Sequence, residues 1–261
     1  MHIRKVLFTV LLLGLPLTPS YADLIYNPIG GYSWLSFHPP LANNSITGFP
    51  DWNGKRIYLS PARHSNAGQR GECPGLLGNE NTAAFNVAVR TADDYLDIPG
   101  SWWFGNFVLI YKLGLAVRGY QVRVGTGTLA SAILNSNTWP ADVHIPIHSN
   151  ARNEGSLGCA NANPNTHGAV AVYVSSQGEL LADEIIRQYQ GVTPGAQDFS
   201  CHVSSPCTAF NSLAELNNTS AVAAYLEREF HTWDEGADFL SDGEEYSWLA
   251  EAVDAYLGRP R

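Results

Sequence analysis

The stretch Val143-His144-Ile145-Pro146-Ile147-His148-Ser149-Asn150-Ala151 decides the fold, because it begins as an apolar strand and ends in imidazole, hydroxyl and amide groups. A short apolar run of this kind is typical of a strand buried on both faces of a parallel sheet. In such sheets, functional side chains lie just beyond the carboxyl ends of the strands. His148 stands at that point, so we predict it to be a site residue. His144 shares its strand face but lies about 13 Å away along the strand, too far to bind the same ion.

The N-terminal residues 1–22 have the features of a secretory signal peptide. Arg4 and Lys5 precede an apolar run over 6–17, and Ser20-Tyr21-Ala22 is a small-x-small cleavage site. The apolar run is too short to span a bilayer, which makes an N-terminal anchor the weaker alternative. We therefore expect an exported protein, periplasmic or extracellular, with no membrane span after signal removal.

The charge balance argues against nucleic acid as a partner. The sequence has 15 Lys and Arg against 24 Asp and Glu, a net charge of −9. An acidic protein without a basic stripe does not bind a phosphate backbone.

The four cysteines are expected to form disulfides, because an even number in an exported chain is typical of disulfide bonding. Three pairings are possible. Cys201 and Cys207 bracket a short loop, so we favour that pair, which leaves Cys73 with Cys159. None of the spacings is the C-x-x-C pattern of a zinc site.

Strand and helix patterns alternate along the chain, which favours a single α/β domain with a mostly parallel, twisted sheet and helices on both faces. The domain is expected over 23–261, with an irregular lead-in at 23–54 that is rich in Pro, Gly and Asn. The residue pattern predicts strands over 56–60, 121–124, 143–147 and 169–174, helices over 80–96, 107–118, 129–134, 178–189 and 246–257, and either type over 221–230.

Two histidines and one glutamate stand where they could converge on a metal ion. His64 follows the strand over 56–60, His148 ends the central strand, and Glu80 begins a helix. Three protein ligands with an open fourth position are the arrangement of catalytic zinc. Each residue also has an ordinary structural explanation, since a glutamate at a helix start is favourable against the helix dipole in any protein. Spacing alone does not decide between a zinc site and these structural roles.

Five short motifs in order add to this pattern. They are Leu59-Ser60-Pro61-Ala62-Arg63-His64, Gly78-Asn79-Glu80-Asn81, Arg118-Gly119-Tyr120-Gln121-Val122-Arg123, Ile145-Pro146-Ile147-His148-Ser149-Asn150-Ala151 and Leu226-Glu227-Arg228-Glu229-Phe230-His231. Together they resemble the zinc-dependent N-acetylmuramoyl-L-alanine amidases of the amidase-3 type. The resemblance covers the chain from about Lys55 to its end.

The resemblance implies a phosphorylase/hydrolase-like α/β fold and a set of site residues. His64, Glu80 and His148 would be the zinc ligands, and Glu227 would be the catalytic carboxylate on a strand. Two departures from the family pattern stand out: the first motif has one residue more between proline and histidine, and Glu229 replaces a glycine. Glu227 and Glu229 share a strand face by the period of two, so the choice between them rests on the resemblance.

The implied reaction is zinc-dependent hydrolysis of the amide between N-acetylmuramic acid and L-alanine, in peptidoglycan or its fragments. Zinc would lower the pKa of a bound water and polarise the carbonyl, and Glu227 would carry the proton. Arg63 and Arg70 could pair with a peptide carboxylate, or be solvated loop residues. Asn150 could donate a hydrogen bond to the substrate, or hold its own loop.

Three other functions fit parts of the sequence. A related zinc peptidase acting on stem peptides would use the same ligands and base. A non-catalytic cell-wall-binding protein would need no general base. The segment Gly125-Thr126-Gly127-Thr128-Leu129-Ala130 fits a dinucleotide fingerprint, but the acidic residue expected after the next strand is missing.

Overall fold

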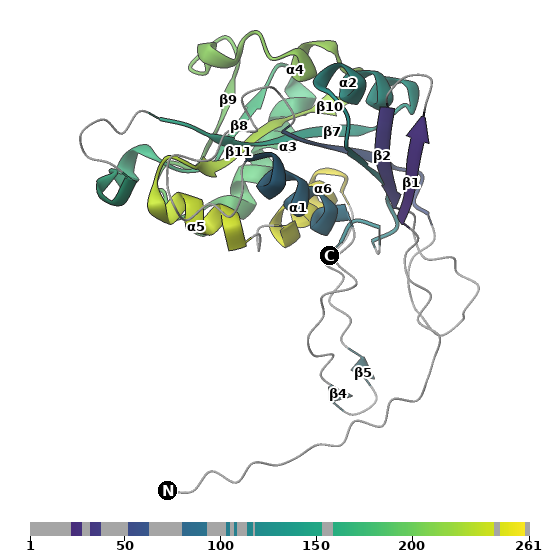
Figure 1. The fold of residues 1–261 in the computed structure, drawn as a ribbon, viewed down its shortest axis with the longest axis horizontal. Helices are drawn as coiled ribbons and strands as arrows, with labels where there is room; N and C mark the ends of the chain where they lie inside the picture. Colours follow the sequence, from purple (N-terminus) through teal and green to yellow (C-terminus); the bar gives the residue numbers. More distant parts are fainter. Residues whose placement is uncertain are drawn as a thin grey trace, which may run out of the picture.

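The strand β7 (Val143–Asn150) lies inside a nine-stranded sheet of the computed structural model, as its apolar run predicts. The structure describes residues 22–27, 32–37, 52–62, 80–92, 103–104, 107–108, 114–116, 118–152, 159–242 and 246–258. Figure 1 shows the sheet crossing the molecule with helices above and below it.

The sheet has the strand order β1-β2-β6-β3-β7-β11-β8-β9, with β10 pairing to β7 before β11 begins. The four central strands β6, β3, β7 and β11 are parallel, whereas β2 and β8 run antiparallel to their central neighbours. The strands of this sheet are β1 (Ala22–Asn27), β2 (Tyr32–Phe37), β3 (Arg56–Pro61), β6 (Gln121–Gly125), β7, β8 (Val170–Tyr173), β9 (Phe199–His202), β10 (Val222–Ala223) and β11 (Tyr225–Phe230).

The helices cover both faces, which confirms the expected α/β class. Figure 1 shows α1, α5 and α6 on one side of the sheet and α2 and α4 on the other. The helices are α1 (Glu80–Ala92), α2 (Leu129–Thr138), α3 (Ser176–Tyr189), α4 (Ala214–Asn218), α5 (Asp234–Asp242) and α6 (Tyr246–Tyr256), with short 3-10 turns at Cys159–Asn161, Pro164–Thr166 and Thr208–Phe210.

Alternate residues of β7 face the two helical layers. Val143, Ile145 and Ile147 are fully buried in the main core, which also holds side chains of α1, α3 and α6. Ala84 and Ala88 of α1 are fully buried there because their spacing places them on one helix face. The other β7 face carries His144 and His148 toward α2 and α4, so the sheet separates an apolar layer from a polar one.

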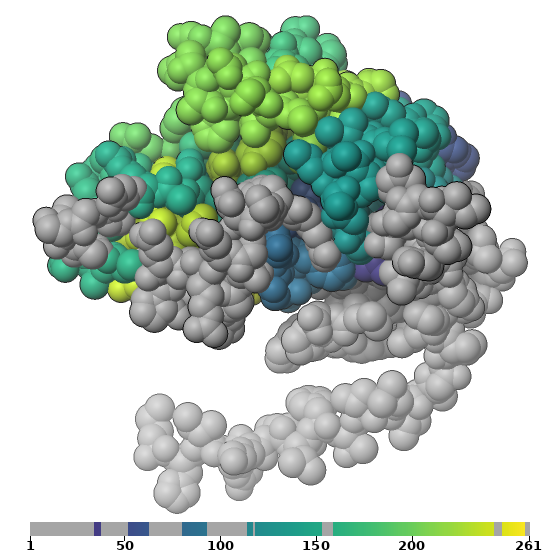
Figure 2. Space-filling view, turned by 45° about the horizontal axis from the view of Figure 1, so that its top comes forward, coloured from purple at the N-terminus to yellow at the C-terminus, as the bar shows by residue number. Residues whose placement is uncertain are grey.

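The polar layer is covered by α2 and α4, which lie side by side. Asn137 donates from Nδ2 to the Asn218 carbonyl at 2.9 Å and accepts from the Ser220 N–H at 2.8 Å. Figure 2 shows the two helices adjoining on the surface, α2 in teal and α4 in yellow-green.

Two segments differ from the sequence expectation. The lead-in expected to be irregular over 23–54 contains two strands where the structure describes it: β1 and β2 extend the sheet, and Trp34 pairs with Gly125 of β6. The helix predicted over 107–118 is also wrong where the structure describes it. Phe107–Val108 forms the strand β5, paired with β4 (Trp103–Phe104), and Gly119 follows a turn with a φ of 91°. The helices α4 and α5 and the strand β9 were not predicted.

The favoured disulfide between Cys201 and Cys207 is confirmed. Cys159 is also disulfide-bonded, whereas Cys73 lies outside the described residues. Residues 1–21 of the predicted signal peptide lie outside them as well. No helix in the described ranges is both long and apolar enough to cross a membrane.

Candidate active site

The parallel pairing of β7 with β11 places His148 beside Glu227. The two residues are direct register partners, and both are buried. Because parallel strands end at the same edge, the carboxyl ends of β7 and β11 bring their polar side chains together there. Tyr225, two residues before Glu227, stacks on the His148 ring with 4.6 Å between centroids.

Glu80 reaches the same point from the first turn of α1. Its Oε1 lies 3.1 Å from His148 Nδ1 and accepts the Ser149 N–H at 2.9 Å. The two predicted ligands are therefore in direct contact although they are 68 residues apart in the chain. The contact forms because the first residue of α1 lies next to the carboxyl end of β7.

Three glutamates act on His148, and the buried Arg228 donates from Nε to its carbonyl at 3.4 Å. Burial lowers the pKa of His148, but Glu80, Glu227 and Glu215 of α4 outweigh it, so the pKa lies above its ordinary value. Burial in turn raises the pKa of Glu80, yet the hydrogen bond and charge of His148 lower it below 4.5 overall. Such an environment favours a positive charge at this point, whether an imidazolium or a metal ion.

Glu227 is the carboxylate that has one oxygen outside the hydrogen bonds of the described residues. Its Oε2 is buried and has no hydrogen-bond partner among the described residues, and the residue is only 6 % exposed. Burial raises the pKa of Glu227 to about 7, against the lowering effect of His148. A carboxyl group near neutrality next to an imidazole can both take up and release a proton at physiological pH.

Glu229, the alternative carboxylate, is fully engaged elsewhere. Its Oε1 accepts the N–H groups of Gly168 at 2.9 Å and Phe230 at 2.8 Å, and its Oε2 accepts that of Gly195 at 3.1 Å. Both oxygens therefore hold loops to the end of β11. The geometry favours Glu227 over Glu229 as the residue that acts on a substrate.

Several predicted site residues lie outside the described part of the chain. His64, Arg63 and Arg70 are among them, so the structure does not test them. Within the described ranges no group of three metal-binding side chains comes together, but Glu80 and His148 are in contact. Asn150 is described, and its Oδ1 accepts the Ala151 N–H at 2.8 Å, which leaves its amide nitrogen for another partner.

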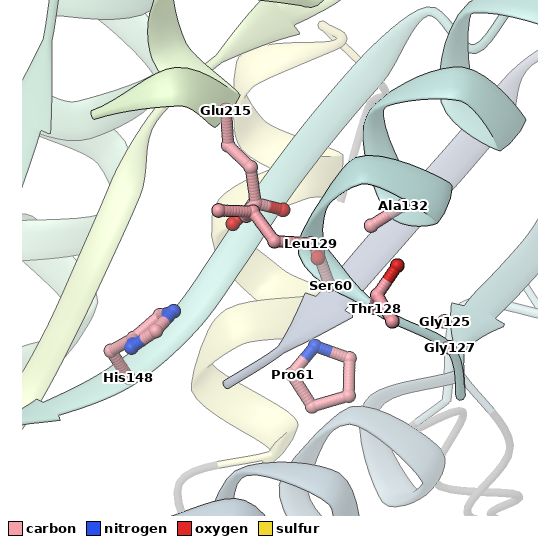
Figure 3. Close-up of a pocket in the computed structure, with 9 residues that line it drawn as sticks. All are labelled: Ser60, Pro61, Gly125, Gly127, Thr128, Leu129, Ala132, His148 and Glu215. Carbon is pink, nitrogen blue, oxygen red and sulfur yellow. The ribbon is translucent and has the colours of Figure 1, made fainter. Parts of the chain in front are cut away.

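Three further residues at this site were not predicted. Ser149 Oγ lies 2.9 Å from Nδ1 of His231, which follows β11. Glu215 lines a recess that also includes His148, Ser60 and Thr128 (Figure 3). No sequence signal could have found Glu215, because it lies on a five-residue helix in a polar segment.

Comparison with solved structures identifies the fold. No family model matches the chain, and no curated protein matches it. The catalytic domain of the N-acetylmuramoyl-L-alanine amidase CwlV from Bacillus (Paenibacillus) polymyxa var. colistinus is similar with a TM-score of 0.55 and 13% identity, covering 79% of this chain and 99% of that one.

Two other solved amidase structures are similar to this chain. The N-acetylmuramoyl-L-alanine amidase AmiC2 of Nostoc punctiforme has a TM-score of 0.55 at 15% identity, covering 80% of this chain and 99% of its own. An N-acetylmuramoyl-L-alanine amidase from Clostridium difficile 630 has a TM-score of 0.52 at 18% identity, covering 78% and 94%. The chain therefore has the α/β fold of N-acetylmuramoyl-L-alanine amidase catalytic domains, the fold that its motifs predict.

Proposed function

We propose that this protein is a zinc-dependent N-acetylmuramoyl-L-alanine amidase that hydrolyses the amide between N-acetylmuramic acid and L-alanine in peptidoglycan or its fragments. One observation carries the proposal: Glu80 and His148 are in contact at a strand end, and on the neighbouring strand the buried Oε2 of Glu227 has no partner in the described part of the chain. The similarity to solved amidases supports the choice of reaction.

The described residues fit a zinc ion. Glu80 and His148 offer a carboxylate oxygen and an imidazole nitrogen, both common zinc ligands. Both residues are buried, and the carboxylates of Glu227 and Glu215 lie nearby. We propose His64 as the third ligand. When bound there, zinc supplies Lewis-acid polarisation of the substrate carbonyl and lowers the pKa of water.

The side chains of this protein would then divide the remaining work. Glu227 takes a proton from the attacking water and returns it to the departing alanine nitrogen, so the C–N bond breaks with a neutral amine leaving. Ser149 holds Glu80 through its N–H, and Tyr225 holds the His148 ring by stacking. Arg63, Arg70 and the free amide nitrogen of Asn150 are proposed substrate contacts.

We also propose that the mature protein is exported to the periplasm or the extracellular space, where peptidoglycan is found. The signal-like residues 1–22 and the disulfide between Cys201 and Cys207 support this location. Both features agree with a cell-wall substrate.

The test combines metal analysis of the mature protein with mass spectrometry of muropeptide products. We expect one zinc per chain and products in which L-alanine has a free amine and the sugar is intact. Cleavage within the peptide stem would instead indicate a peptidase. His148→Ala should lose bound zinc. His202 is a histidine on the distant strand β9, so the control variant His202→Ala should keep the zinc. Full zinc occupancy in His148→Ala would remove His148 from the ligand set.

A further inference from the structure

A small recess on the polar face of the sheet adjoins His148. It is bounded by the hydroxyl-bearing residues Ser60 and Thr128, by Glu215, and by the apolar side chains of Pro61, Leu129 and Ala132. Figure 3 shows Glu215 reaching into this space from one side, with Thr128 and the glycines of the β6–α2 loop on the other. The recess is therefore continuous with the proposed active site.

The Glu215 carboxylate is held rigidly. The residue is 3 % exposed, and its Oε1 lies 3.0 Å from Nε2 of the fully buried His144. His144 in turn stacks on Tyr58, with 5.2 Å between ring centroids and planes 5° apart. The second carboxylate oxygen of Glu215 accepts no hydrogen bond from the described residues, so it can accept one from a ligand.

The opposite wall is formed by Gly125, Gly127 and Thr128. Gly125 leaves room for the buried side chain of Tyr58, whose hydroxyl would lie 2.8 Å from a Cβ at this position. Thr128 caps α2 by accepting the Ser131 N–H at 3.3 Å, so its hydroxyl hydrogen remains available to a ligand. The segment that resembles a dinucleotide fingerprint thus forms a wall of the recess.

We propose that this recess is a subsite for the 2-acetamido group of muramic acid. The acetamido N–H would donate to Glu215, its carbonyl would accept from Ser60 or Thr128, and its methyl group would contact Leu129 and Ala132. This proposal rests on the proposed function. In N-acetylmuramic acid the acetamido group is on the carbon next to the one that bears the lactyl ether, which places it near the scissile carbonyl.

The surrounding charge supports a neutral donor group rather than an acid. Glu215 lines the recess together with His148, which contacts Glu80 and pairs in register with Glu227. The Glu215 carboxylate that lines the recess repels a carboxylate of the stem peptide and attracts an N–H donor. The sugar side of the substrate therefore fits the recess better than the peptide side.

The test compares substrates that differ only at the 2-position of the sugar in an L-alanyl peptide conjugate: acetamido, propionamido, free amine and hydroxyl. With the zinc-loaded mature protein, we expect kcat/KM for the acetamido substrate to exceed each of the others by about tenfold or more. Glu215→Gln should lower the acetamido-to-hydroxyl ratio by about tenfold, mainly through KM. General structural damage would lower both rates and leave that ratio unchanged.

A second variant does not depend on the buried carboxylate. Leu129→Ala should raise kcat/KM for the propionamido substrate relative to the acetamido one. Leu134→Ala is its matched control, because Leu134 is on the same helix and equally exposed, at 42% against 40%, but does not line the recess. Equal rates on acetamido and hydroxyl substrates in the wild type would overturn the subsite, as would preference for the free amine.

Failure of the proposed function gives a different result. If no conjugate is cleaved at any amide, the amidase proposal fails, and calorimetry with N-acetylmuramic acid and its 2-hydroxyl analogue still tests the recess. Binding of the acetamido sugar alone, abolished by Glu215→Gln, would support the subsite. Equal binding of both sugars, or of neither, would overturn it.

Discussion

Glu227 and Glu229 are two residues apart on β11, yet they have opposite surroundings. Each is buried, and burial raises the pKa of each to about 7. Glu229 accepts from three backbone N–H donors, whereas Glu227 has a buried oxygen to which no described residue donates. One carboxylate is used to hold loops together, and the other is left unsatisfied beside His148.

The difference arises from the end of the strand. Pairing between β7 and β11 is regular at Glu227, which faces His148, and its register shifts before Phe230. Glu229 lies within that irregularity, where it meets the loops that contain Gly168 and Gly195. A buried polar group without a partner costs free energy, so a fold keeps one chiefly where function requires it.

The largest expected effect is the loss of turnover in Glu227→Gln. The variant keeps the shape of the side chain but cannot accept a proton, so we expect kcat to fall at least about 100-fold. Zinc content should remain at the wild-type level. Glu229→Gln is the matched control, and its kcat per folded molecule should stay within about tenfold of wild type. Comparable losses in both variants would remove the distinction between the two residues.

For the free energy of unfolding, the order should be reversed: substitution of Glu229 should have the larger effect. Glu229→Ala leaves three buried N–H groups without an acceptor, which should cost about 3 kcal/mol or more in the free energy of unfolding. Glu227→Ala removes a carboxylate with an unpartnered oxygen, so its cost should be less than about 1 kcal/mol in zinc-free protein. Urea denaturation of both variants measures the contrast. A greater loss in Glu227→Ala would mean that Glu227 also has a structural role.

The sequence predicted the parts of this arrangement that depend on local pattern. The apolar run before His148 indicates β7, and the alanine spacing after Glu80 indicates α1. The functional assignment of His148, Glu80 and Glu227 needed the family resemblance, because a histidine at a strand end has no unique meaning.

Long-range pairing explains what the sequence did not reveal. The segment around Trp34 is locally irregular in composition and becomes a strand through its pairing with β6. Glu215 is 71 residues from His144, its hydrogen-bond partner. The separate roles of Glu227 and Glu229 depend on a register shift and on two distant loops, and no periodicity encodes either.

The pH dependence of stability offers a third comparison. The pKa of Glu229 is about 7 in the folded protein and about 4.5 ordinarily, so the folded state binds more protons between these values. Its contribution to stability is therefore fully present below pH 4.5 and is lost as the pH rises through 7, by on the order of 3 kcal/mol. The contribution of Glu227 to stability should show the same pH dependence in zinc-free protein.

Each Gln variant should therefore flatten the decline in unfolding free energy from pH 5 to pH 8. The measurement is urea denaturation of zinc-free wild type, Glu227→Gln and Glu229→Gln across that range. An unchanged slope in Glu229→Gln, with a flatter one in Glu227→Gln, would show that the three N–H donors outweigh burial at Glu229. That outcome would make the two residues differ even more than their pKa values suggest.

The smallest expected effect concerns the loop that Glu229 holds. Thr193 donates from Oγ1 to Asp198 at 2.6 Å, and Asp198 accepts the Ala169 N–H at 2.8 Å, beside the Gly168 and Gly195 contacts of Glu229. Thr193→Val should cost about 1 kcal/mol of unfolding free energy and leave activity intact. Because Thr193 and Glu229 hold the same loop, a double-mutant cycle with Glu229→Ala should show a coupling of at least about 0.5 kcal/mol. The cycle with Glu227→Ala should be additive, since that carboxylate has no share in the loop; coupling of similar size in both cycles would mean that the loop also supports the active site.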